Sequence, residues 1–132
     1  MIKGKYLLPL VLCLFLAGCA PLIIFGVGTA AGIGGYKWYE GKLAVIYQAS
    51  FVDTWDATLK VIEHMNMLVE KKNHDLTAGN INARRADRKP VTISLAYKSE
   101  KETEAGIRVG IFGDRSASMA IKEEIRKELF KE

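Results

Sequence analysis

The sequence has few of the side chains that enzymes and metal centres use. Its 132 residues include two cysteines and two histidines. The histidines, His64 and His74, fall in different predicted elements, and neither has a second ligand at the spacing of a metal site. Ser116 and Ser118 lack the glycine-flanked turn of a nucleophilic serine. We therefore predict a protein that is not an enzyme and that binds neither a metal ion nor a cofactor.

A large excess of one charge is also lacking. Lys and Arg number 19 and Asp and Glu 15, which gives a net charge of +4. Two of the positive residues, Lys3 and Lys5, precede the first apolar segment, so the rest of the chain is close to neutral. A near-neutral domain lacks the electrostatic footprint of a nucleic-acid binder. We expect no nucleic acid among its partners.

One stretch carries no charge at all. No Asp, Glu, Lys or Arg occurs from Tyr6 to Gly35, whereas charged and apolar residues alternate freely after it. Two lysines followed by the apolar run 6–16 have the layout of a secretory signal peptide. We predict that residues 1–18 are this signal and are cleaved from the mature chain.

The end of the predicted signal, Leu16-Ala17-Gly18-Cys19, resembles the lipobox of bacterial lipoproteins. Small residues before the cut let the peptidase reach the backbone, and a thiol is the nucleophile that becomes a thioether to diacylglycerol. Cys19 is therefore the predicted lipid-attachment residue. The alternative is a buried cysteine in an uncleaved transmembrane anchor. If Cys13 leaves with the signal and Cys19 is acylated, the mature chain has no free thiol and no disulfide.

The residue after this cysteine bears on location. It is Ala20 and not an aspartate, which by resemblance to lipoproteins of bacteria with two membranes favours export to the outer membrane. Several acyl chains hold a protein far more firmly than one. We expect a lipid-anchored protein at the outer membrane that faces the periplasm.

The segment 19–36 is rich in glycine and alanine. Its uncharged part, Pro21 to Gly35, is shorter than the roughly 20 residues that a membrane-spanning helix needs. Two readings stay open: a flexible tether, or a membrane-apposed helix that self-associates into a homo-oligomer through small residues spaced by four, as in a glycine zipper. The residues of the second reading are Gly26, Gly28, Ala30, Gly32 and Gly34.

Residues 37–132 are predicted to form a single domain. The β-forming run 43–49 predicts a strand, and Ser50 is placed to cap a helix that ends near Met65. Further strands are expected at 67–71, 79–85, 91–97 and 107–111, and the last two are joined by a charged hairpin at 99–104. Either Asp114 or Ser116 could cap a final helix with an apolar stripe.

The predicted order of elements is β-α-β-β-β-β-α. One-sided alternation in the strands and a single apolar stripe on each helix favour two layers. The expected fold class is α+β, with an antiparallel sheet that carries both helices on one face. The patterns do not predict the order of the strands in the sheet.

The densest basic cluster lies at the predicted hairpin of residues 84–89. It has two readings. A solvated turn is one, because charged hairpin tips are common. Contact with an anionic envelope component, either lipid phosphates or cell-wall polymer, is the other, because guanidinium groups bind such anions in a bidentate manner. The candidate contact residues are Arg84, Arg85, Arg88 and Lys89.

Several segments together resemble a family of small bacterial lipoproteins. The similarity is carried by LAGC, the glycine-rich stretch after it, YKWYEGKLAVIYQAS, WDATLKVIEHM, DLTAGNINA and IRVGIFGDRSAS. It covers nearly the whole chain. The family is known as a domain of unknown function, number three-five-six-eight, so the resemblance implies location and architecture but supplies no functional residue.

These observations favour a non-enzymatic, membrane-anchored lipoprotein whose domain is an envelope binding or assembly module. A second hypothesis is a periplasmic domain that binds a small ligand or lipid in the space between its sheet and helices. A small hydrolase is the third hypothesis.

Overall fold

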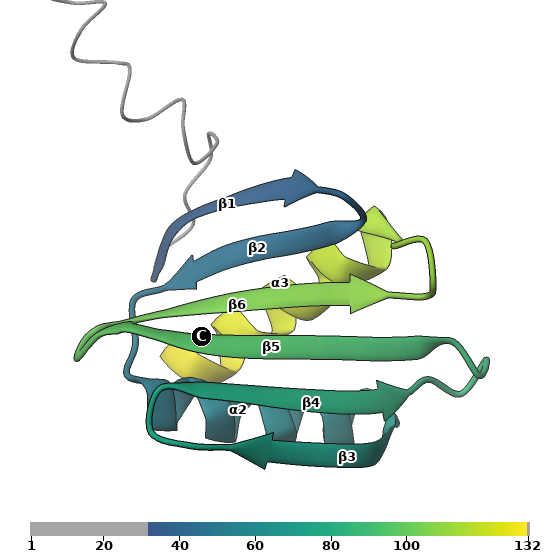
Figure 1. The fold of residues 1–132 in the computed structure, drawn as a ribbon, viewed down its shortest axis with the longest axis horizontal. Helices are drawn as coiled ribbons and strands as arrows, with labels where there is room; N and C mark the ends of the chain where they lie inside the picture. The colour runs from purple at the N-terminus through teal and green to yellow at the C-terminus, as the bar shows by residue number, and fades with distance from the viewer. Residues whose placement is uncertain (1–31, 132) are drawn as a thin grey trace, which may run out of the picture.

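The domain consists of a six-stranded antiparallel sheet with two helices packed on one of its faces (Figure 1). The structure is a computed structural model that describes residues 32–131. The strands lie in the order β1-β2-β6-β5-β4-β3. Along the chain the elements are β1 (Ile33–Tyr39), β2 (Lys42–Tyr47), α2 (Phe51–His64), β3 (Leu68–His74), β4 (Ala78–Arg84), β5 (Pro90–Ser99), β6 (Glu102–Val109) and α3 (Arg115–Phe130).

The predicted α+β class is confirmed, and from Lys42 onward the element order is the predicted β-α-β-β-β-β-α. Both helices lie behind the sheet in the view of Figure 1, as the one-sided patterns required. None of the helices within residues 32–131 is long and apolar enough to cross a bilayer.

Strand β1 was not predicted. Its sequence IGGYKWY has two adjacent glycines and no clean alternation, so the strand pattern is weak. It is held by antiparallel pairing with β2 through a two-residue turn at Glu40 and Gly41, which both have positive φ (51° and 77°). Such a turn matches the twist of the two strands that it joins. The predicted boundary between residues 36 and 37 therefore falls inside a strand.

Strand β1 also bears on the predicted glycine-faced helix. Gly34 lies in β1, and Gly32 lies in the turn before it with φ of 85°. A side chain on Gly32 would overlap the ring of Phe130, so the start of the domain packs under the end of α3. These two glycines do not belong to a glycine-faced helix. Residues 1–31, with Cys19, Gly26, Gly28 and Ala30, lie outside the described residues.

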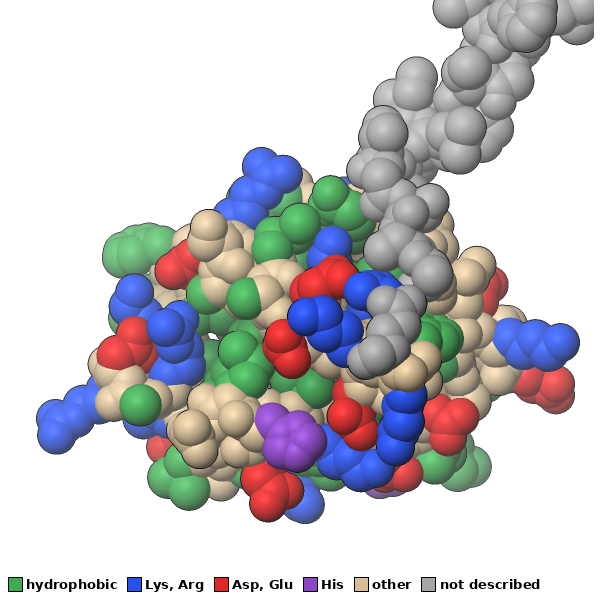
Figure 2. Space-filling model, turned by 180° about the vertical axis from the view of Figure 1, so that it is seen from behind, with side chains coloured by type: hydrophobic (Ala, Val, Ile, Leu, Met, Phe, Trp, Pro, Cys, Tyr) green, Lys and Arg blue, Asp and Glu red, His purple; other side chains and the backbone are tan. Residues whose placement is uncertain are grey.

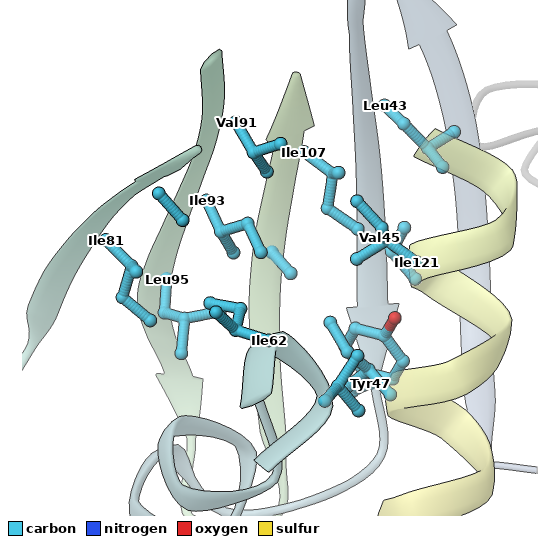
Figure 3. Close-up of a cluster of buried hydrophobic side chains, with 14 of the residues drawn as sticks. Leu43, Val45, Tyr47, Ile62, Ile81, Val91, Ile93, Leu95, Ile107 and Ile121 are labelled. Atoms are coloured by element: carbon cyan, nitrogen blue, oxygen red, sulfur yellow. The ribbon is translucent and has the colours of Figure 1, made fainter. Parts of the chain in front are cut away.

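The core is built from the inward faces of the strands and the apolar stripes of the helices. In Figure 3, Ile62 of α2 and Ile121 of α3 point toward the inward side chains of the sheet. Each side chain of this size contributes roughly 1.5–3 kcal/mol when fully buried. The largest fully buried side chains are Leu43, Val45, Tyr47, Ile62, Ile81, Val91, Ile93, Leu95, Val109, Ile107, Ile121 and Ile125.

Both helices are capped by residues that were candidate caps in the sequence. Ser50 Oγ accepts a hydrogen bond from the backbone N–H of Asp53 at 3.2 Å, as predicted. At the second helix, Asp114 Oδ1 accepts from the N–H of Ala117 at 3.0 Å. The cap of α3 is thus Asp114 and not Ser116, which is exposed on the first turn.

Helix α3 also buries polar groups against β1 and β2. Tyr47 Oη donates a hydrogen bond to the carbonyl of Lys122 at 2.8 Å, and burial raises the pKa of this phenol well above its usual value. The ammonium of Lys122 lies 4.1 Å from the ring centre of Tyr36, a cation–π contact. Desolvation lowers the pKa of Lys122. These contacts fix α3 beneath the β1–β2 hairpin.

One buried hydroxyl leads to a prediction about stability. Ser118 is fully buried in α3, and its Oγ has no hydrogen-bond partner within residues 32–131. We expect Ser118→Ala to stabilise the domain by about 1 kcal/mol, because it removes an unsatisfied polar group and improves helix propensity. The melting temperature, measured by circular dichroism on the detergent-solubilised chain, should rise by roughly 4–8 °C.

The matched control is Thr103→Val. Thr103 is equally buried, but its Oγ1 donates to the carbonyl of Ala49 at 2.9 Å. Loss of that bond leaves a carbonyl unsatisfied, so this variant should melt at a lower temperature. A fall in melting temperature for Ser118→Ala would show that its hydroxyl contributes to stability.

Candidate functional site

Three turns lie together at one end of the sheet, on the right of Figure 1. They are the β1–β2 turn (residues 40–41), the β4–β5 hairpin (85–89) and the β6–α3 loop (110–114). We call this region the loop end. The described chain begins at Gly32, at the opposite end of the sheet, where β1 starts. The loop end is therefore separated from the N-terminal segment by the length of the strands.

The β6–α3 loop exposes two large apolar side chains. Ile111 is 75% exposed and Phe112 is 93% exposed. The sequence pattern predicted a strand over 107–111, but β6 ends at Val109 because Gly110 turns the chain with φ of 78°. The predicted end of this strand is wrong, and Ile111 points to solvent. Large apolar side chains that are exposed side by side point to a surface that binds a partner or a membrane.

The loop that carries these side chains is tightly held. The backbones of Gly41 and Gly113 are in contact: a Cβ on Gly113 would overlap the carbonyl oxygen of Gly41, and a Cβ on Gly41 would lie 2.5 Å from the carbonyl oxygen of Phe112. The N–H of Gly110 donates to the carbonyl of Pro90 at 2.7 Å. The exposure of the apolar pair is thus fixed by backbone contacts on both sides.

The predicted basic cluster divides into two pairs. The guanidinium of Arg84 binds Glu70, with Nε 3.2 Å from Oε1, and also donates to the carbonyl of Arg88 at 2.8 Å. Arg85 Nη2 lies 3.4 Å from Asp87 Oδ2. These first two arginines are therefore engaged within the hairpin and with strand β3, whereas anion contact by any of the four basic residues stays a prediction.

The second pair faces the apolar loop. Arg88 and Lys89 line an open groove of about 620 Å³ together with Ile111, Phe112 and Arg115. None of these three basic side chains has an ion-pair partner among residues 32–131. Their charges are therefore available to an anion beside the apolar pair.

Carboxylates at the loop end offset part of this charge: Asp87 and Asp114 line the same groove, and Glu40 lies in the β1–β2 turn. Asp87 is paired with Arg85, and its Oδ1 also accepts from the N–H of Lys89 at 3.2 Å. Asp114 caps α3. Figure 2, which views the molecule from the helix side, shows hydrophobic side chains beside Lys and Arg at its left edge, the loop end. The local surface is both apolar and basic.

A second hollow adjoins the first on the helix side. It has a volume of about 330 Å³ and is lined by Met65, Met67 and Ala117 among others. Met67 is buried in the core, as expected of a core filler, and Met65 is half-buried. Asp87 borders both hollows, so the two are neighbours at the loop end.

The uncovered face of the sheet has a smaller hollow. A hollow of about 250 Å³ is lined by small residues and by Lys37, Lys42 and Glu104. The Lys42 side chain lies across Gly106, where a Cβ would overlap it. Lys98 Nζ is 3.6 Å from Glu104 Oε2. The charged groups on this face are thus partly occupied with one another.

Neither histidine lines the loop-end groove. His64 ends α2 and is exposed. His74 ends β3, and its ring centre is 4.5 Å from that of Trp55. Within residues 32–131 no group of three or more His, Cys, Asp or Glu side chains is arranged to hold a metal ion.

Only part of the loop end could be predicted from the sequence. Arg88 and Lys89 were candidate contact residues, but Arg115 was not, and Ile111 and Phe112 were assigned to a strand and its end. The available signal was the sequence GIFG, in which Gly110 and Gly113 enclose the apolar pair. Two glycines three positions apart favour a turn with positive φ at both, and the structure has φ of 78° and 89° there.

The fold and the loop end define a class: a two-layer α+β domain with one bare sheet face and a rigid apolar and basic tip. A family model described as "Protein of unknown function (DUF3568)" matches residues 3–128, and the chain belongs to this family. The resemblance found in the sequence is thereby confirmed. No curated protein matches the chain.

The backbone contact at the loop end can be tested by Gly113→Ala. The variant must keep φ near 89° and must also move the Gly41 carbonyl, so we expect a loss of stability well above the roughly 1–2 kcal/mol of a left-handed alanine alone. Thermal unfolding measures this loss, and hydrogen exchange at residues 110–114 should become faster.

Gly110→Ala is the control for this substitution. Gly110 has a similar φ of 78°, but nothing lies within 4 Å of the position of its Cβ. This variant bears only the backbone strain. Equal losses of stability in the two variants would mean that the Gly41–Gly113 contact does not hold the loop.

Proposed function

We propose that the protein is a lipoprotein of the bacterial envelope, acylated at Cys19 and anchored in the outer membrane with residues 32–131 in the periplasm. The observation that carries this proposal is the sequence LAGC after two lysines and an uncharged apolar run. The charge, the apolar length and the small residues before the cysteine all agree with a lipoprotein signal.

We further propose that the domain is a non-enzymatic binding module that uses the loop end. Support comes from the rigid exposure of Ile111 and Phe112 beside Arg88, Lys89 and Arg115. The most deeply buried titratable groups have structural partners instead of catalytic ones, since Tyr47 binds the α3 backbone and Lys122 lies on Tyr36.

The alternative of a ligand held between the sheet and the helices has less support. That space is filled by side chains such as Ile62, Ile93 and Ile107, which are at most 1% exposed (Figure 3). The described hollows open at the surface instead. A small molecule would need to displace part of this core, and core substitutions of that size typically cost 2–5 kcal/mol.

Labelling with radioactive palmitate in cells tests the anchor. We expect the wild type to incorporate label and to fractionate with the outer membrane, and Cys19→Ser to lose the label and remain as unprocessed precursor. Because a thiol is the acceptor, serine cannot replace it in the thioether.

Cys13→Ser is the matched control, since Cys13 lies in the predicted signal. It should label like the wild type. Label retained in Cys19→Ser, or lost in Cys13→Ser alone, would contradict acylation at Cys19.

A further inference from the structure

We propose that the loop end is a second membrane contact, which seats Ile111 and Phe112 in the interface of the anionic bilayer that anchors the chain. The inference rests on the proposed acylation of Cys19, because the anchor is what brings the bilayer within reach. It assigns a lipid surface, and not a soluble ligand, to the apolar and basic tip.

The shape of the tip suits a bilayer. Phe112 and Ile111 stand out from the surface, and the Gly41–Gly113 contact keeps them there without a partner. At the base of the tip, the N–H of Gly110 donates to the carbonyl of Pro90 at 2.7 Å. A seat in the hydrated interface, and not in the hydrocarbon core, leaves the other backbone groups of the loop in contact with water.

The charges suit an anionic lipid surface. Arg88, Lys89 and Arg115 line the groove with the apolar pair and have no ion-pair partner within the described part of the chain, whereas Asp87, which also borders the groove, is paired with Arg85. Guanidinium groups bind phosphate in a bidentate manner. Basic residues beside apolar ones are the combination that binds anionic membrane interfaces.

The size of the patch argues against a soluble protein partner. Phe and Ile side chains together can bury roughly 300–400 Å², whereas a stable protein interface needs about 800 Å² on each partner. A small contact suffices when it is intramolecular, because a tether raises the effective concentration of the second site. A domain attached to its own membrane satisfies that condition.

The tether is long enough for this geometry. Residues 20–31 connect Cys19 to the described domain, and twelve residues span at most about 43 Å. Strand β6, with its eight residues, is about 27 Å long. The loop end lies one strand length from Gly32, so the domain can lie along the membrane and reach it with its far end.

The test places a fluorescent probe on the tip of the acylated full chain. The variant Phe112→Cys is labelled with an environment-sensitive thiol dye and reconstituted in vesicles of phosphatidylcholine with or without phosphatidylglycerol. We expect blue-shifted, brighter emission only with phosphatidylglycerol. Leu76→Cys is the matched control, because Leu76 is 91% exposed in the β3–β4 turn at the opposite end of the sheet, and its emission should stay polar.

Charge is tested in the same labelled chain. Arg88→Gln with Lys89→Gln should lower the equilibrium constant of the contact by about fivefold for each charge removed. The control is Lys71→Gln with Lys72→Gln on the edge strand β3, which should leave the emission unchanged. Thermal unfolding of each variant confirms that the fold is intact.

The outcomes separate this inference from the proposed function. Dye uptake by the wild-type chain would mean that Cys19 is free, which overturns the anchor and with it this inference. With Cys19 blocked, polar emission at position 112 overturns the membrane contact alone, as does equal emission at positions 112 and 76. A shift that needs added envelope proteins and not phosphatidylglycerol would assign the tip to a protein partner and would also overturn it.

Discussion

The contact between Gly41 and Gly113 is the constraint on which the candidate surface depends. It joins the turn of the β1–β2 hairpin to the loop between β6 and α3, and no side chain larger than hydrogen fits at either position. Arg108 adds a second tie, since its Nη2 donates to the carbonyl of Glu40 at 2.8 Å. Because β1 carries the turn, the edge strand that the patterns did not predict is what orders the tip. A domain without β1 would lose the support of this loop and also the core side chain of Ile33.

Strand β1 also links the two ends of the domain. β1 begins at Ile33, directly after Gly32, which packs against Phe130 at the end of α3, and it ends at the turn that contacts the loop before α3. The two ends of one helix are thus fixed to the two ends of one strand. The chain enters the domain at one end, and the apolar and basic tip lies at the other.

Much of the fold could be predicted from the sequence because it follows local periods. The alternation in 91–97 and the stripes of both helices specify which faces are buried, and Ser50 marks a helix start. Pairing in space could not be predicted, because β2 joins β6 across more than half of the domain. The site was predicted in part for the same reason. Arg84 is occupied by Glu70 of the neighbouring strand β3, and no pattern within 84–89 indicates that contact.

Exposure alone does not single out the loop end, and Leu76 shows why. It is nearly as exposed as Phe112, but it lies in a turn that Asp75 organises by accepting from the N–H groups of Thr77 (2.8 Å) and Ala78 (2.9 Å). Those hydrogen bonds lower the pKa of Asp75, so the turn presents a fixed negative charge. An anionic surface would be repelled there and attracted at the tip. Residues that depart from local folding preferences without adding stability are expected at functional sites. The tip combines positive-φ glycines, an exposed apolar pair and basic groups without ion pairs in residues 32–131, whereas the Leu76 turn has only the exposed side chain.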